Sequence, residues 1–249
     1  LPEIKAITFT GSTEVGRRVG MLAGQNLKKS VLELGGNDAY ILDESADIEK
    51  AVNSCLRAKL INNGQSCIAA KRFFILETQK EVFLDLFVRG LLTKKMGDPF
   101  EQGVDLGPLA HQRFRTRTVL QARQLELILD KDRSQKELWE KLKQRVLPEK
   151  GFYYSPQCFV ASSDQGWTEE DFYNSFQSVE IFAPVALVYV YKSEQELYHR
   201  VNQSPYGLGA AWFGDPEKFQ KTQVAKKIDV GMVAVNEMLR SDARVPFGG

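Results

Sequence analysis

Cysteine and histidine are scarce in this sequence, and each shortage excludes a class of protein. Only three cysteines occur among the 249 residues, Cys55, Cys67 and Cys158, and no two of them form a CxxC pair. Because disulfide frameworks need more cysteines in even number, we expect a reducing compartment, the cytoplasm. With His111 and His199 as the only histidines, a structural zinc site is improbable, and we predict no metal.

An excess of charge of one sign is also lacking. The formal net charge is +1, from 33 basic and 32 acidic residues. This balance gives no electrostatic reason to bind nucleic acid or an anionic membrane. No run of about 18 apolar residues is present, so we expect no membrane-spanning helix. Hydrophobic residues make up 43% of the chain, which is ordinary for a globular protein in water.

The two ends predict that the chain is a piece of a longer protein. It begins LPEIKAITF without an initiator methionine and stops at PFGG, where two glycines would normally lead into further chain.

Apolar strand-like runs alternate with helical segments along the chain. We predict helices near 193–203 and 215–227 among others. The alternation, with strand runs that are apolar on both faces, indicates an α/β fold with a largely parallel sheet. The first run is expected to be a buried strand. The predicted strands are 4–10, 31–34, 39–42, 72–76, 184–191, 209–213 and 231–235.

Residues 112–147 differ from the rest of the chain. They are highly charged and contain no glycine and no strand signal. We interpret them as a pair of surface helices.

FTGSTEVG, residues 9–16, is the first stretch that could bind a ligand. A strand runs into Gly11 and Ser12, and a helix begins there. Backbone N–H groups at a helix start favour a phosphate, and Gly11 and Gly16 let a ligand approach the backbone closely. The stretch is neither a P-loop nor GxGxxG. A tight strand–helix turn without a ligand is an equally good interpretation.

LELGG, residues 32–36, places Glu33 between two leucines of an apolar strand. Burying an unpaired carboxylate is costly, so Glu33 either pairs with a cation or serves as a general base. An edge-strand glutamate that faces water is the alternative.

INNGQSCIAAKR, residues 61–72, surrounds Cys67 with small and amide residues that leave its sulfur accessible. The thiolate is the reactive form of cysteine, and we expect a backbone-lined pocket to lower the pKa of Cys67. Cys55 lies on an apolar helical stripe and is expected in the core, as is Cys158.

The order of seven motifs is similar to that of the aldehyde dehydrogenase superfamily: FTGST, LELGG, GQSC, EIFAPV, PYGLGAA, VAVNE and PFGG. The similarity covers essentially the whole chain and is weakest between about 110 and 178. The GQSCIAAKRF and SDARVPFGG stretches look closest to the succinate-semialdehyde dehydrogenase branch. The resemblance also implies that the N-terminal part and the extreme C-terminus of the family's chain are missing.

For the fold, the resemblance implies a three-layer α/β/α catalytic domain with a partial Rossmann-type cofactor domain. Residues 1–36 would be the C-terminal part of the dinucleotide-binding domain and 37–235 the catalytic domain. Residues 236–249 would begin a return segment towards the missing C-terminus.

For single residues, the resemblance implies that Cys67 is the nucleophile and Glu33 the general base. It implies that Asn236 lies near the substrate channel and that Ser241 binds the substrate carboxylate. Arg244 could add positive charge for that carboxylate, and a solvated surface arginine is the alternative. The resemblance also implies a cofactor, NAD or NADP, held by Gly11, Ser12, Gly16, Leu34, Gly35, Glu180 and Phe182.

For function, the resemblance implies NAD(P)-dependent oxidation of an aldehyde, with succinate semialdehyde as the expected substrate. The reaction would pass through a thiohemiacetal and a thioester on Cys67, and the full-length protein would be a homodimer or homotetramer. The branch often places an arginine six residues before the nucleophile, where this chain has Ile61.

Three other interpretations stay open. The substrate could be another aliphatic aldehyde. The chain could be a catalytically silent fragment or pseudoenzyme of this fold. It could also be a cysteine hydrolase that pairs Cys67 with His111 or His199.

Overall fold

The structure is a computed structural model, and it describes residues 1–129, 136–162 and 167–249. Strands and helices alternate along these ranges. The strands are β1 Ala6–Thr10, β2 Lys29–Glu33, β3 Ala39–Leu42, β4 Arg72–Leu76, β5 Gln157–Ser162, β6 Val185–Tyr191, β7 Gly209–Phe213 and β8 Met232–Val235. The helices are α1 Thr13–Gln25, α2 Ile48–Leu60, α3 Lys80–Leu92, α4 Gln112–Leu129, α5 Lys136–Lys143, α6 Glu169–Phe172, α7 Glu194–Asn202, α8 Pro216–Lys221 and α9 Val224–Lys227.

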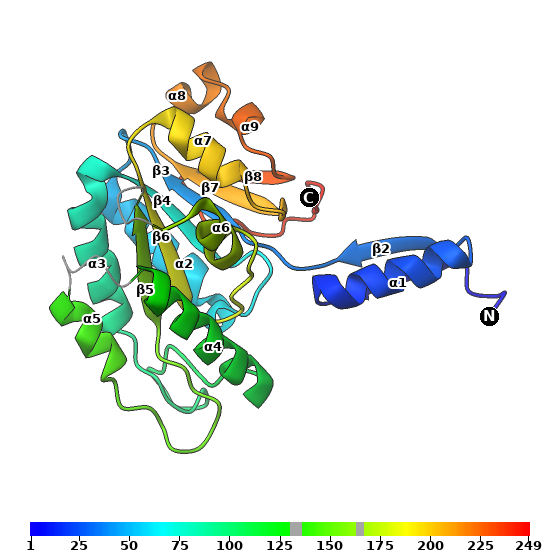
Figure 1. Ribbon diagram of the computed structural model, residues 1–249, viewed down its shortest axis with the longest axis horizontal. Coiled ribbons are helices and arrows are strands. Elements are labelled where there is room, and N and C mark those ends of the chain that lie inside the picture. Colours follow the sequence, from blue (N-terminus) through cyan, green and yellow to red (C-terminus); the bar gives the residue numbers. More distant parts are fainter. Residues whose placement is uncertain (130–135, 163–166) are drawn as a thin grey trace.

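The strands form two separate sheets (Figure 1). Six of them make one sheet in the order β5-β6-β4-β3-β7-β8, and every pair in it is parallel. The other sheet is the parallel pair β1-β2. Both sheets match the expected α/β class.

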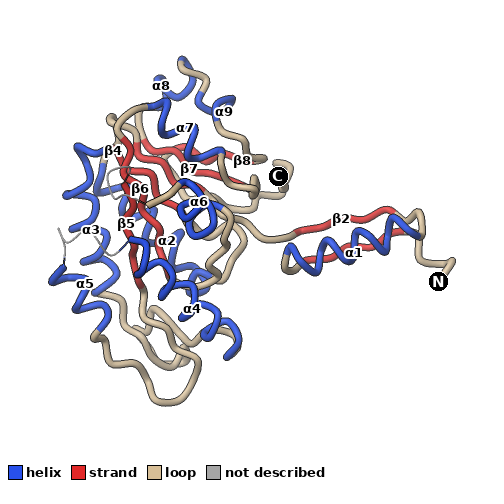
Figure 2. Tube along the Cα trace, viewed as in Figure 1, coloured by secondary structure: helices blue, strands red, loops and turns tan. Residues whose placement is uncertain are grey.

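Helices cover both faces of the six-stranded sheet (Figure 2). Phe74 of β4 packs on the face under α4, α6 and α7. Its neighbours Phe73 and Ile75 point to the opposite face, under α2, α3 and α5. Because successive side chains of a strand point to opposite faces, both faces must be apolar, and β6 is buried at every position. The three-layer α/β/α fold is confirmed.

Local signals in the sequence explain several elements. The Asp47 carboxylate accepts a hydrogen bond from the Lys50 N–H and so caps α2, whose buried face includes Cys55. Cys158 is buried in β5, so both cysteines lie in the core as predicted. The charged stretch forms helices α4 and α5 as predicted, and its residues 130–135 lie outside the described ranges.

Residues 1–33, called the N-terminal arm below, project away from the six-stranded body (Figure 1). The prediction that the first strand is buried is wrong, because β1 alternates between exposed and half-buried residues. Helix α1 packs on β1 and β2, and a single helix covers only one face of a sheet. Residues 34–38 connect the two sheets, and the domain boundary expected after residue 36 falls within them. The assignment of residues 1–36 to a dinucleotide-binding domain stays a prediction.

Candidate functional site

The loops that lead into four neighbouring strands of the six-stranded sheet meet at the same end of those strands. Residues 34–38 lead into β3, 65–71 into β4, 178–184 into β6 and 204–208 into β7. All four strands are parallel, so these connections lie together at the amino ends of the strands. LELGG, GQSC, EIFAP and PYGLG are thus gathered from distant parts of the sequence.

Cys67 packs directly against the LELGG segment. A Cβ atom on Gly36 would lie 2.4 Å from the Cys67 carbonyl oxygen, closer than any real contact. Only glycine therefore lets this backbone approach the Cys67 loop. The Cys67 side chain is half-buried, whereas Cys55 and Cys158 are fully enclosed. Of the three thiols, Cys67 is the one that a small molecule can reach.

Lys71 joins the Cys67 loop to the EIFAP segment. Its ammonium group donates hydrogen bonds to the carbonyl oxygens of Ser66 (2.6 Å) and Cys67 (2.8 Å). The same group lies 3.5 Å from a carboxylate oxygen of Glu180. The Lys71 side chain is 1% exposed, so these contacts replace its lost hydration. This cation fixes the positions of the thiol and the glutamate relative to each other.

The pKa of Cys67 is higher than expected from the sequence. Burial raises it above the ordinary value, and the carboxylates of Asp38 and Glu180 raise it further. The Lys71 ammonium and the Ile68 N–H lower it without fully offsetting the burial. The prediction of a lowered pKa is therefore wrong, because desolvation outweighs the effect of the Lys71 cation.

A turn with left-handed backbone directly precedes the Cys67 loop. Asn62, Asn63 and Gly64 all have positive φ, at 47°, 56° and 74°. The Asn63 side chain donates to the carbonyl oxygens of Gly107 (2.8 Å) and Pro108 (3.1 Å). Such strained backbone persists where surrounding contacts hold it in place, often beside functional sites.

Asp38 is a buried carboxyl group beside this loop. Its side chain is 2% exposed, and among the described residues neither of its oxygens has a donor at hydrogen-bonding geometry. Burial raises the pKa of Asp38 to about 7, against partial offset from Lys71, the Gly209 amide and Arg72. Its oxygen lies 3.2 Å from the Cβ position of Gly36. A titratable carboxyl group therefore lies beside the backbone segment that packs on Cys67.

Arg72 links several segments around the site through hydrogen bonds. Its guanidinium donates to the carbonyl oxygens of Asn37 (2.8 Å) and Val201 (3.1 Å) and to the amide oxygen of Gln177 (2.5 Å). Burial lowers the pKa of Arg72 to about 9, with the Asp38 charge acting in the opposite direction. These bonds tie together the segments that precede β3 and β6.

Glu33 lies at the end of β2, half-buried, where the N-terminal arm meets the body. Its carbonyl oxygen accepts a hydrogen bond from the Gly11 N–H at 3.0 Å. Glu33 is three positions before Gly36, so its Cα is at most about 11 Å from the glycine that packs on Cys67. Glu33 is therefore near in sequence to the segment that packs on the Cys67 loop, and its role as general base stays a prediction.

The start of α1 faces the same region. The Ser12 side chain caps the helix by accepting from the Val15 N–H, and Gly16 packs under Leu34, where a Cβ would approach it to 2.3 Å. Burial raises the pKa of Tyr206, with a further contribution from Glu180, and the nearby Thr13 hydroxyl lowers it. Tyr206 thus lies between the α1 start and the body.

Glu180 and the glycine pair are in direct contact. The Gly36 N–H donates to a Glu180 carboxylate oxygen at 3.2 Å, and a Cβ on Gly35 would lie 2.5 Å from the other oxygen. Phe182 lies farther along the same segment, with its ring 6.0 Å from that of Phe114. Glu180, Gly35 and Leu34 therefore share one side of the site.

The three expected substrate residues are placed differently. Asn236 follows β8, and its side-chain amide makes two hydrogen bonds to the Gly214 backbone, 2.9 and 2.8 Å, at the carboxyl ends of the strands. Asn236 therefore lies at the opposite end of the strands from Cys67. Ser241 is exposed, and Arg244 is exposed and pairs with Asp242 at 2.6 Å.

Both histidines are exposed and engaged in local contacts. The Nδ1 atom of His111 accepts from the Arg113 N–H, and the ring of His199 bonds to Gln203. Neither contact involves Cys67. Over the described ranges there is no cluster of three or more potential metal ligands, and no helix is long and apolar enough to cross a membrane.

Lys71, Asp38 and Tyr206 were not predicted as site residues from the sequence. Lys71 and Asp38 follow the motifs that were recognised, in QSCIAAKR and GGND, and Tyr206 lies within PYGLG. A cation or acid at the start of an apolar strand is the signal that could have marked the first two, because such a group is costly to bury without a partner.

Comparisons with known proteins place this geometry in a family. The family model described as "Aldehyde dehydrogenase family" matches residues 1–249. An aldehyde dehydrogenase of Paenarthrobacter nicotinovorans is 38% identical over 247 residues, which are 99% of this chain and 50% of that protein. A probable NADP⁺-dependent succinate-semialdehyde dehydrogenase of Synechocystis is 35% identical, with the same coverage.

A solved structure agrees with these relatives. The crystal structure of succinic semialdehyde dehydrogenase from Streptococcus pyogenes in complex with NADP⁺ superposes with a TM-score of 0.82 and 31% identity. The match covers 98% of this chain and 50% of that one. The chain therefore spans about half the length of the curated relatives and the solved structure that it matches.

Proposed function

Because the chain belongs to the aldehyde dehydrogenase family, we propose that it carries the catalytic thiol of an NAD(P)-dependent enzyme that oxidises an aldehyde to the carboxylic acid. The observation that carries this proposal is the packing of the Cys67 loop on Gly36, with Lys71 joining that loop to Glu180. One reachable thiol is thus set beside the segments that would meet a nicotinamide cofactor.

The residues present fit NAD or NADP, which the family implies. The α1 start offers the Ser12 N–H group to a pyrophosphate beside Gly11, whose own N–H is bonded to the Glu33 carbonyl oxygen, and Gly16 keeps this turn close to Leu34. Glu180 contacts the glycine pair and Phe182 follows two residues later beside Phe114, and we propose that a ribose and a nicotinamide ring bind along this segment. When bound, the cofactor would accept the hydride from the substrate carbon.

In the proposed reaction, the Cys67 thiolate attacks the aldehyde carbon and forms a thiohemiacetal. The oxyanion needs preorganised donors, and the Cys67 backbone N–H is one candidate. Loss of hydride leaves a thioester on the same sulfur. Glu33, at the inner end of the N-terminal arm, takes a proton from a water molecule that then releases the acid.

For the substrate we propose succinate semialdehyde. This follows the names of the Synechocystis and Streptococcus relatives and the Ser241 position near the PFGG ending. Asn236 and Arg244 were expected to contribute as well. Asn236 lies at the opposite end of the strands from Cys67, and Arg244 forms an ion pair with Asp242. Both observations favour structural roles for these two side chains.

The test is aldehyde-dependent formation of NADPH or NADH by the protein that contains these residues. Cys67→Ala should abolish it, whereas Cys158→Ala, a change at a buried thiol, should reduce it only as far as it destabilises the fold. Glu33→Gln should still give one rapid turnover, followed by a slow steady state, because the thioester forms without the base. Full activity of Cys67→Ala would remove the proposal and reopen the pseudoenzyme and hydrolase interpretations.

We also propose a cytoplasmic homodimer or homotetramer for the whole protein. The three free thiols support a reducing compartment, and family membership supports assembly. Light scattering of the purified protein tests the oligomeric state, and a fluorescent fusion tests the compartment.

A further inference from the structure

A pocket of about 560 Å³ opens beside the end of α2, where the turn that leads to Cys67 begins. This volume lies within the range of about 300–1,000 Å³ that small-molecule sites occupy. Most of its wall is apolar, and the rest carries two cations, one acid and one amide. The lining residues are Asn53, Leu56, Arg57, Leu60, Ile61, Lys94, Asp105, Leu106 and Met238.

The charges of this pocket leave one cation without an acidic partner. Lys94 and Asp105 form an ion pair at 3.6 Å, so they largely neutralise each other. Arg57 is exposed at the pocket wall, and no ion pair of Arg57 is found among the described residues. An apolar wall with one uncompensated guanidinium suits a short aliphatic chain that ends in a carboxylate.

The chain leads from the pocket wall directly to the Cys67 loop. Leu60 and Ile61 line the pocket, and the left-handed turn that begins at Ile61 leads to Cys67 six residues later. Arg57 lies one helical turn before Ile61, on the same side of α2. Along the chain, the cation Arg57 is thus followed by the apolar side chain of Ile61 and then by the Cys67 loop.

The other wall of the pocket leads to the same place. Met238 lines the pocket, and its neighbour Leu239 packs on Gly209, where a Cβ would lie 2.1 Å from the leucine side chain. That same Cβ position is 3.2 Å from Asp38, beside the segment that packs on Cys67. Residues on both sides of the pocket are therefore neighbours, in sequence or in packing, of the segments that surround Cys67.

We propose that this pocket receives the carboxylate-bearing end of the substrate and that Arg57 binds the carboxylate. The inference rests on the proposed function and gives its substrate a chemical class: an aliphatic aldehyde with an acid group at the far end. It also gives an alternative source of positive charge where Ile61 occupies the position at which an arginine was expected.

The test compares succinate semialdehyde with butanal, an uncharged aldehyde of the same chain length, as substrates of the intact protein. Arg57→Gln should raise KM for succinate semialdehyde about tenfold or more, because a charge-assisted hydrogen bond is lost, and leave kcat nearly unchanged. With butanal, kcat/KM should change less than about twofold. Arg57→Lys should restore part of the preference for the acid.

Arg123→Gln is the matched control, because Arg123 is an exposed arginine of α4 on the other face of the sheet. Equal effects of Arg57→Gln on both substrates, or the same KM increase in Arg123→Gln, would overturn the assignment of Arg57. If the unmodified protein oxidises butanal but not succinate semialdehyde, the acid pocket is wrong and the oxidation itself stands. If it oxidises neither, the proposed function is wrong.

Discussion

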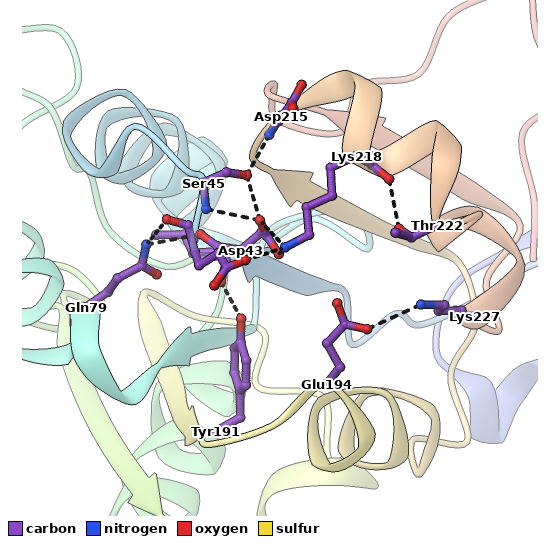
Figure 3. Close-up of polar contacts among 11 residues, drawn as sticks. Asp43, Ser45, Gln79, Tyr191, Glu194, Asp215, Lys218, Thr222 and Lys227 are labelled. Atoms are coloured by element: carbon purple, nitrogen blue, oxygen red, sulfur yellow. Dashed lines mark hydrogen bonds and ion pairs between the residues drawn. The ribbon is translucent and has the colours of Figure 1, made fainter.

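At the residue scale, strand β3 has an aspartate at each end, in opposite electrostatic environments. Asp38 precedes the strand beside the Cys67 loop, and burial raises its pKa to about 7. Asp43 follows the strand. Burial alone would raise its pKa as well, but hydrogen bonds from Lys218 and Ser45 outweigh it and lower the pKa (Figure 3). The paired carboxylate stabilises the fold when charged, and the unpaired one when protonated.

This difference predicts opposite responses to substitution by asparagine. Between its ordinary value of 3.8 and about 7, Asp38 holds a proton in the folded state that the unfolded chain has released, so stability falls as pH rises through this window. Asp38→Asn should flatten that slope in urea unfolding measured from pH 5 to pH 8.

Asp43 supplies the control at the other end of the strand. The charged Asp43 carboxylate stabilises the folded state at pH values above its ordinary pKa. This stabilisation is lost as pH falls through the lowered pKa that Asp43 has in the folded state. Asp43→Asn should therefore cost about 1–3 kcal/mol of unfolding free energy at neutral pH, by removing a charged hydrogen-bond acceptor from Lys218. Identical pH slopes for wild type and Asp38→Asn would show that Asp38 is ionised throughout the window.

At the element scale, the left-handed turn before Cys67 depends on a glycine. A Cβ on Gly64 would lie 2.3 Å from the Ala183 carbonyl oxygen, at a φ of 74°. Gly103 has a similar φ of 79°, and nothing lies within 4 Å of its Cβ position. Substitution of Gly103 therefore tests backbone strain alone, whereas substitution of Gly64 tests the same strain together with a steric clash.

We predict that Gly103→Ala costs about 1–2 kcal/mol, the strain of a left-handed alanine. Gly64→Ala should cost clearly more, because the Cys67 loop or the segment that contains Ala183 must move. Urea unfolding measures both costs, and the rate of Cys67 alkylation by iodoacetamide should change only in Gly64→Ala. Equal costs with unchanged alkylation would mean that the two segments separate easily.

Most elements could be predicted from the sequence, whereas their contacts could not. Apolar runs such as VALVYVY identify strands, because a strand buried on both faces must be apolar throughout. Strand β5, QCFVAS, was missed because half of its residues are small or polar. The motifs located Cys67, Glu33 and Glu180, but the packing of Gly64 on Ala183 joins distant segments and leaves no local signal.

At the scale of the whole molecule, the six-stranded body and the N-terminal arm differ in how completely they are covered. Each face of the body's sheet has its own helices, and β3, β4 and β6 are buried at nearly every position. The arm has two strands and one helix. Apolar side chains such as Val31 (61% exposed) remain open to solvent there. The sequence could not predict this difference, because an apolar run does not reveal how many layers will cover it.

This difference predicts two levels of protection in hydrogen exchange of the 249-residue chain. A two-stranded sheet with one covered face is marginally stable, so amides of β1 and β2 should exchange through frequent local opening. Amides of β3, β4 and β6 should exchange only on global unfolding, which for a stability of about 5 kcal/mol or more means at least about a thousandfold slower. Strand β8, at the edge of the body's sheet, is the internal comparison, and its amides should be intermediate. Equal protection of β2 and β4 would show that the arm unfolds together with the body, and that its contacts through Tyr206 and the glycine pair are stronger than its exposed faces indicate.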